Sequence, residues 1–206
     1  MYDRQGEKRY AVNILHVASN LVGRHEHERF ARGFDRVAEK VFEETGVLIG
    51  FTLDILPHRD EVNNGGCHQD DMVKNTFRAV PKKTGPWLRQ QASFLAVQAF
   101  IPQVYIGTSV VNKLLLFKLS YLQKWLDQRL PVILDVDPGY DAHLLWPGAQ
   151  RWGNDDQWRG LLSTLRALPV QGIVFNTWNG YTEGYAAVPT REDGNANFRW
   201  MQDLFR

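Results

Sequence analysis

Five short runs of apolar and β-branched residues predict buried β-strands, over 10–17, 47–56, 94–101, 132–136 and 172–176. Most positions within each run are apolar, which is typical of parallel strands that are covered on both faces. Stretches of helical periodicity lie between the strands, and they predict helices over 25–44, 112–130, 154–168 and 195–205.

Single residues predict where two of these helices begin or end. Gly46 predicts the end of the first helix, because glycine readily adopts the left-handed conformation that stops a helix. Asn154 is expected to cap the start of the third helix. In contrast, the segment 57–91 is polar and contains glycine and proline, so it predicts a loop with at most a short helix at 70–77.

The alternation of strand and helix indicates an α/β protein built from βαβ units. No Gly-x-Gly-x-x-Gly turn follows the first strand, so a dinucleotide-binding fold is not indicated. Two architectures remain, an open five-stranded sheet and a TIM barrel. Strands recur at intervals of roughly 40 residues, so 206 residues hold about five of the eight units of a barrel. We expect one domain over 1–206 that forms such a partial barrel.

Composition and charge narrow the possible partners. The chain has 24 Lys and Arg against 23 Asp and Glu, a formal net charge of +1. Without a basic excess, neither nucleic acid nor an anionic membrane surface is an expected partner. The apolar runs are too short to span a bilayer, and the first residues predict no signal peptide. The single cysteine, Cys67, cannot form an internal disulfide, and we expect neither a metal nor another cofactor.

The residues that follow the predicted strands suggest a chemistry. In parallel α/β folds, functional groups gather at the carboxyl ends of the strands. Paired carboxylates can cleave a glycosidic bond, amides can bind sugar hydroxyls, and Trp and Tyr rings can stack on the apolar face of a pyranose. All three kinds of group are present in or after the predicted strands, together with one histidine. They are His16, Asp54, Gln98, Asp135, Asp137, Tyr140, Asp141, Trp178, Asn179, Tyr181 and Glu183. We therefore predict a carbohydrate site.

Two segments carry a family resemblance. FNTWNGYTEGYAAVPT resembles the last barrel strand of glycoside hydrolase family 99-like proteins, which ends in a W-N-E-W-x-E-G motif. VILDVDPGYDAH is similar to the V-x-P-G-Y-D stretch on the preceding strand of that group. The resemblance implies that the five strands are the last five of a (β/α)8 barrel, and that three further units would precede Met1.

The resemblance also implies roles for individual residues. Members of the group are endo-acting hydrolases of α-linked mannosides or relatives, and they use two glutamates of this motif. The second, the acid/base, falls on Glu183, whereas the first falls on Gly180. Because glycine cannot act as a base, we expect Asp137 or Asp141 to supply the second carboxylate, with Asp54 as a further candidate.

The remaining site residues are expected to bind the saccharide: Trp178, Asn179, Tyr181, Tyr140, Asp54, His16 and Gln98. Two alternatives to a hydrolase stay open. The chain could be a carbohydrate-binding protein without catalysis, or an inactive truncated barrel that self-associates through its open sheet edges. The resemblance favours an extracellular or periplasmic location.

Overall fold

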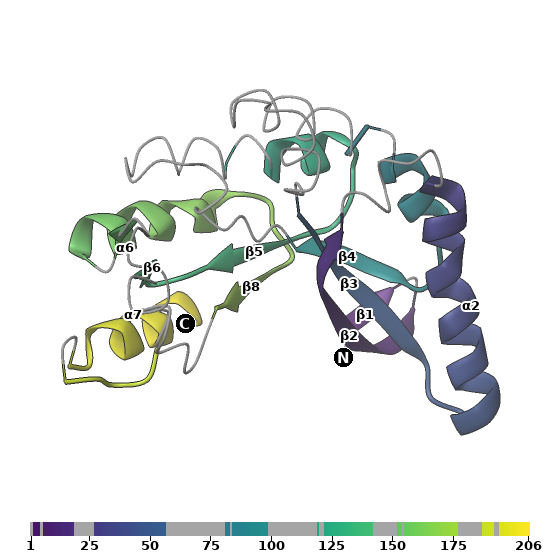
Figure 1. Ribbon diagram of the computed structural model, residues 1–206, viewed down its shortest axis with the longest axis horizontal. Coiled ribbons are helices and arrows are strands. Elements are labelled where there is room, and N and C mark those ends of the chain that lie inside the picture. Colours follow the sequence, from purple (N-terminus) through teal and green to yellow (C-terminus); the bar gives the residue numbers. More distant parts are fainter. Residues whose placement is uncertain are drawn as a thin grey trace. The chain divides into compact units, whose positions relative to one another are not determined.

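The computed structural model describes most of the predicted strands and helices (Figure 1). The described residues are 2–4, 6–18, 27–56, 81–82, 84–98, 119, 122–141, 152–153, 155–176, 187–191 and 194–206. They group into two compact units, one formed by 1–101 with 121–132 and the other by 102–120 with 133–206.

All five predicted strands are present: β2 (Glu7–Ala18), β3 (Ile49–Leu56), β4 (Phe94–Gln98), β5 (Val132–Val136) and β8 (Gly172–Phe175). In the first unit, β2 pairs with β3 and β3 pairs with β4, and both pairings are parallel. In the second unit, β5 pairs with β8, again in parallel. The prediction of an α/β protein with parallel strands is therefore confirmed.

The first unit carries one strand that was not predicted. The strand β1 (Tyr2–Arg4) pairs antiparallel with the start of β2, with Tyr2 opposite Arg9 and Arg4 opposite Glu7. Its three residues are too few to produce a recognisable alternation of apolar and polar positions.

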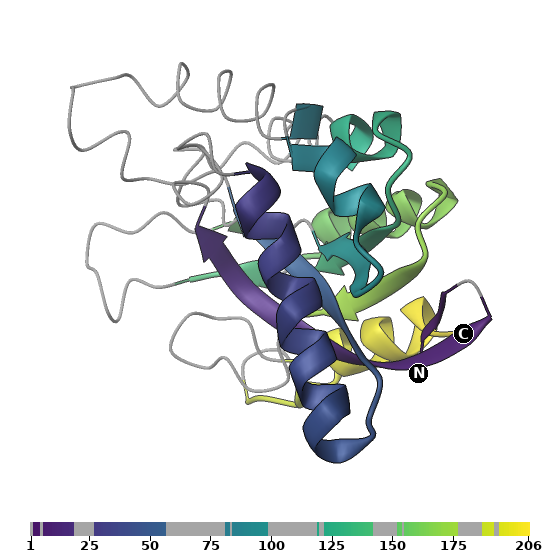
Figure 2. The ribbon, with the colours of Figure 1, turned by 90° about the vertical axis from the view of Figure 1, so that its right-hand side faces the viewer.

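The helix α2 (His27–Thr45) covers one face of the sheet in the first unit (Figure 2). The ring of Phe34 on α2 lies 5.0 Å from the ring of Phe51 on β3, measured between centroids. The helix ends as predicted: Gly46 has a φ of 70°, and its N–H donates to the carbonyl of Phe42 at 2.8 Å.

The interpretation of 57–91 as a loop is wrong in its last part. Residues 84–90 are helical, and the side chain of Leu88 is fully buried. The short helix expected at 70–77 lies outside the described residues. Of the predicted helix 112–130, residues 119 and 122–130 are described. Residues 119 and 122–127 are helical, whereas 128–129 form a turn, so the predicted helix end was three residues late.

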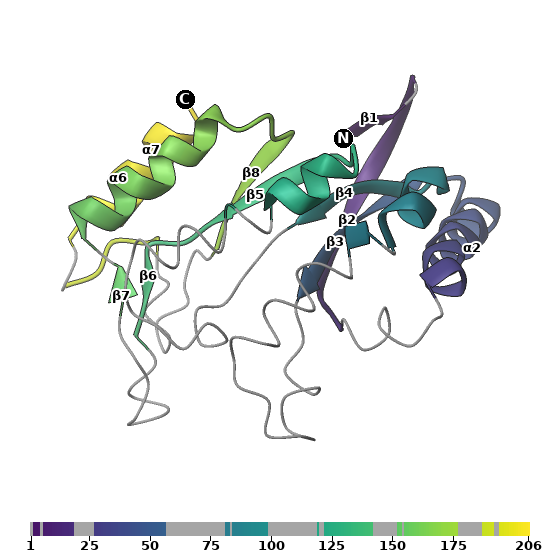
Figure 3. The same ribbon diagram turned by 90° about the horizontal axis from the view of Figure 1, so that it is seen from above.

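In the second unit, α6 (Asp156–Thr164), the 3₁₀ turn η2 (Leu165–Ala167) and α7 (Ala196–Leu204) accompany β5 and β8 (Figure 3). The predicted N-cap of α6 was one residue early. Asp155, not Asn154, is the cap, and its carboxylate accepts a hydrogen bond from the Trp158 N–H at 2.7 Å. An aspartate adds charge to this bond and interacts favourably with the positive end of the helix dipole.

Among the described residues, no helix combines the length and the apolar character needed to cross a membrane.

Candidate functional site

Two of the predicted site residues lie side by side at the carboxyl ends of neighbouring strands. Asp54 on β3 and Gln98 on β4 are direct partners in the parallel register. Both side chains are buried, with 0% and 2% of their surface exposed. A carboxylate that accepts hydrogen bonds is thus placed beside an amide that can both donate and accept them.

A second pair of polar residues consists of Asn13 on β2 and Thr52 on β3, which lies two residues before Asp54. The Thr52 hydroxyl donates to the side-chain carbonyl of Asn13 at 3.1 Å, and the two residues are register partners. Neither residue was predicted as part of the site. The signal was weak, because one threonine or asparagine within an otherwise apolar strand is common in sheets of any function.

Thr52, Asp54 and Gln98 lie on the face of the first unit's sheet that α2 does not cover. Phe51 packs against α2, and side chains alternate between the faces of a strand, so Thr52 and Asp54 point away from this helix. A register irregularity at β4 keeps Gln98 on the same face as its partner Asp54. In a parallel α/β protein, this face at the strand ends is where ligands bind.

The second unit repeats this arrangement with acidic side chains. Phe175 on β8 contacts Trp200 of α7, with ring centroids 5.3 Å apart. Phe175 is the register partner of Val136, so Asp135, the preceding residue on β5, points to the opposite face. The side chain of Asp135 is fully buried, and so is that of Asp137, which directly follows the strand.

Hydrogen bonds fix the backbone around Asp137. The indole Nε1–H of Trp158, on α6, donates to the carbonyl of Asp137 at 2.9 Å. Trp158 itself is 1% exposed, so this bond is shielded from water. Sequence reasoning missed Trp158, because a tryptophan at a helical position is more often only a core residue.

The segment that follows Asp137 is held by a short pair of antiparallel strands. The strand β6 (Gly139–Tyr140) pairs with β7 (Trp152–Gly153). This pairing positions the backbone of Tyr140 and of Asp141, the next residue. Asp141 is half-buried, so its environment differs from that of the fully buried Asp137.

The position of His16 is described at the level of the backbone alone. It lies in β2, in the stretch between Ile14 and Val17 where the register with β3 shifts. Such irregularities are frequent beside functional sites, where they change the direction of a side chain.

The aromatic and acidic motif of the last strand lies outside the described residues. This applies to the candidates Trp178, Asn179, Tyr181 and Glu183, and to Gly180. The chain enters this segment directly from β8: the backbone N–H of Asn176 donates to the carbonyl of Val136 at 2.8 Å. Asn176, the last described residue before this segment, therefore lies at the carboxyl end of β8, next to the end of β5.

A metal centre is not visible in the described part of the chain. No group of three or more His, Cys, Asp and Glu side chains in the described residues is arranged to hold a metal ion.

Comparisons with known proteins add no assignment. No protein-family model matches the chain, and no curated protein matches it.

Proposed function

We propose that the protein is a glycoside hydrolase that acts on an oligo- or polysaccharide, and that its parallel strands belong to a TIM-like (β/α)8 barrel. One observation carries the proposal: in each unit, carboxylates lie at the carboxyl ends of parallel strands, on the face opposite a covering helix. Asp54 and Gln98 supply this chemistry in the first unit, and Asp135 and Asp137 supply it in the second. The Trp178–Glu183 segment follows the strand next to β5.

In the proposed reaction, Glu183 is the general acid. It donates its proton to the glycosidic oxygen as the bond between that oxygen and the anomeric carbon breaks. A second carboxylate accepts a proton from the attacking water or sugar hydroxyl. The oxygen of the water or hydroxyl bonds to the anomeric carbon as the glycosidic bond breaks. The leaving sugar keeps the proton from Glu183 and the second carboxylate keeps the proton from the nucleophile, so the atoms balance without any cofactor, and proton exchange with solvent returns both carboxyl groups to their starting states.

Burial distinguishes Asp141 from the other two candidates for the second carboxylate, Asp137 and Asp54, which are both fully buried. A base must reach the water or hydroxyl that it activates, and the half-buried Asp141 retains access to solvent. Asp137 is fully buried, and its backbone is fixed by Trp158. We therefore assign the base to Asp141 and a positioning role to Asp137.

The substrate-binding groups fit a polyhydroxylated ligand. The carboxylate of Asp54 and the amide of Gln98 are adjacent and buried, so they can accept hydrogen bonds from, and donate them to, hydroxyl groups that reach the ends of β3 and β4. The rings of Trp178 and Tyr181 would stack on a sugar face. The resemblance of the sequence favours α-linked mannosides as the first substrates to test.

The test is the release of reducing ends from α-linked manno-oligosaccharides by the complete protein. We expect Glu183→Gln to lower the rate about 10²- to 10⁴-fold, the range for loss of a general acid. Asp141→Asn should have an effect of similar size. Glu43→Gln changes an exposed glutamate on α2 and serves as the control with an unchanged rate. If Glu183→Gln hydrolyses every tested glycan as fast as the unsubstituted protein, the proposal is refuted.

Gly180 favours a second candidate, a carbohydrate-binding protein without catalysis. Glycine stands where the resembling family has its other motif glutamate, so the catalytic pair of that motif is incomplete. This candidate predicts saccharide binding in a calorimetric titration and no release of reducing ends. Turnover that depends on Glu183 would exclude it.

A further inference from the structure

A pocket of about 190 Å³ opens at the other end of the first unit's sheet, near the amino ends of β2, β3 and β4. It is lined by polar side chains that include Arg9, Asp35 and Glu39, and by the apolar side chains of Ala38, Phe42 and Leu48. None of these residues belongs to the candidate hydrolase site.

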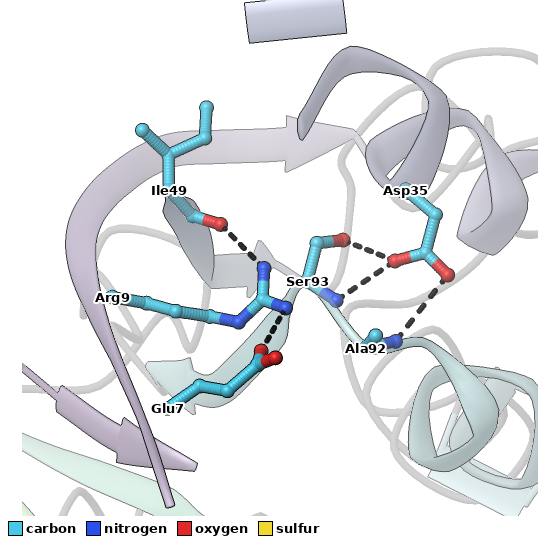
Figure 4. A network of polar contacts seen from close by, with 6 residues as sticks. All are labelled: Glu7, Arg9, Asp35, Ile49, Ala92 and Ser93. Carbon is cyan, nitrogen blue, oxygen red and sulfur yellow. Dashed lines mark hydrogen bonds and ion pairs between the residues drawn. The ribbon is translucent and has the colours of Figure 1, made fainter. Parts of the chain in front are cut away.

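The pocket lining contains two carboxylates, those of Asp35 and Glu39. Figure 4 shows Asp35 accepting three hydrogen bonds, all from neutral donors: the N–H of Ala92 at 3.3 Å, and the N–H and hydroxyl of Ser93 at 2.8 and 2.5 Å. Among the described residues, neither Asp35 nor Glu39 forms an ion pair. The lining therefore holds two carboxylates without an ion-pair partner among the described residues, one hydrogen-bonded and one exposed.

The one cation in the lining is already engaged. Figure 4 shows the Arg9 guanidinium between two acceptors. It donates to the carbonyl of Ile49 at 3.0 Å and forms an ion pair with the Glu7 carboxylate at 2.7 Å. The Arg9 side chain is 11% exposed, so it cannot turn away to meet a ligand without breaking these bonds. Its charge is largely offset by Glu7.

The end of α2 adds to the negative potential. Phe42 lies in the last turn of this helix, where the backbone carbonyls carry partial negative charge. Proteins commonly place a basic residue there, but this last turn has none. Glu44 forms an ion pair with Lys40 at 3.8 Å, whereas Glu43 adds a carboxylate to the last turn.

The size and lining of the pocket indicate what kind of cation it can hold. A volume of about 190 Å³ is below the roughly 300–1,000 Å³ of pockets for small-molecule ligands, and it suits a single side chain. Ala38, Phe42 and Leu48 can cover an aliphatic stem, and the Phe42 ring can interact with a charged group at its end. Phe42 is 47% exposed and Val47 is 39% exposed, so apolar surface remains beside the pocket for the flanking residues of a partner.

We propose that this pocket binds a lysine or arginine side chain presented by a protein partner. The carboxylates of Asp35 and Glu39 receive the charged group, and the apolar lining receives its stem. Charge complementarity selects this occupant over an anion or a neutral side chain. The site is independent of the proposed hydrolase activity and can be tested without any saccharide.

The test uses two tripeptide probes with the full chain, acetyl-Leu-Lys-Leu-amide and its norleucine counterpart, which has a similar stem without the charge. We expect the lysine peptide to bind at least fivefold more tightly by calorimetry and to shift the NMR signals of Phe42, Leu48 and Ala92. Equal affinity of the two peptides, or shifts elsewhere, would overturn the proposal.

Single substitutions test whether the carboxylates of the pocket bind the lysine peptide. Glu39→Gln removes an exposed carboxylate from the lining and should weaken the lysine peptide about fivefold, the scale of a partly exposed ion pair. Glu28→Gln is the control: it lies about 16 Å away along α2, beyond the screening length of about 8 Å, and should leave the affinity unchanged. An unchanged affinity in Glu39→Gln refutes the proposed role of the carboxylates.

Self-association of the chain that is lost in Glu39→Gln would identify a second copy as the occupant and overturn the proposal of a different partner.

Discussion

Replacing Gly50 by alanine tests which face of β3 carries the candidate site. Gly50 lies two and four residues before Thr52 and Asp54 and shares their face of the strand. A Cβ atom added at Gly50 would lie 2.7 Å from Cγ of Leu95 and 2.8 and 2.9 Å from its two Cδ atoms. Carbon atoms in contact are normally about 3.5–4.0 Å apart, so the neighbouring side chain must move.

The expected cost follows from the burial of Leu95. This side chain is 4% exposed and has little room to move. Overpacking of this kind typically costs about 1–3 kcal/mol. We therefore expect Gly50→Ala to lower the free energy of unfolding by about 2 kcal/mol and the thermal midpoint by about 4–8 °C, for a protein of this size.

A double-mutant cycle distinguishes this clash from a general effect of alanine. Leu95→Ala alone should cost about 2–5 kcal/mol, because it leaves a cavity. In that background the added methyl group has space, so Gly50→Ala should cost nothing further. The assay is urea unfolding followed by circular dichroism, with the coupling free energy taken from the four proteins. A neutral Gly50→Ala, or additive costs, would refute the assignment of Gly50 and the site residues to the Leu95 face.

Other substitutions test the elements that support the site. Gly33→Ala, in the interior of α2 with no atom within 4 Å of the added Cβ, should stabilise the protein by about 0.5–1 kcal/mol in the same unfolding assay. Asp155→Ala removes the N-cap of α6 and should cost about 1 kcal/mol, whereas Asp155→Asn should retain most of the stability. Trp158→Phe leaves the buried carbonyl of Asp137 without its indole donor; we expect a loss of about 1–3 kcal/mol and, if Asp137 positions the site, a lower kcat in the reducing-end assay.

The sequence predicted the strands well because their signal is local. Runs such as Val132–Val136 and Phe94–Gln98 are apolar at nearly every position, and they became fully buried strands. The end of α2 was also predictable, because Gly46 adopts the conformation that few other residues tolerate.

The helix at 84–90 could not be predicted from local sequence signals. Gly85 and Pro86 are typical of turns, but the burial of Leu88 overrides their local preference. A Cβ atom at Gly85 would lie 3.0 Å from Cβ of Gln128, so this glycine permits a close approach to a segment more than 40 residues away. Such tertiary contacts leave no local pattern in the sequence.

The candidate site was predictable in part. The position of Asp54 and Asp137 at strand ends followed from the order of the elements. The pairing of Asp54 with Gln98, and the bond from Trp158 to Asp137, depend on register and on packing between elements distant in the sequence. The roles of Glu183 and the aromatic residues around it remain predictions from the sequence.

The most direct test of where the chemistry takes place is a crystal structure of the Glu183→Gln protein with an uncleaved manno-oligosaccharide. We expect the sugar at the carboxyl ends of β5 and β8, with a hydrogen bond to Asp141 and a glycosidic oxygen about 2.6–3.2 Å from the side chain at position 183. A sugar bound elsewhere, such as at the amino ends of the strands near Arg9, would contradict the proposed function.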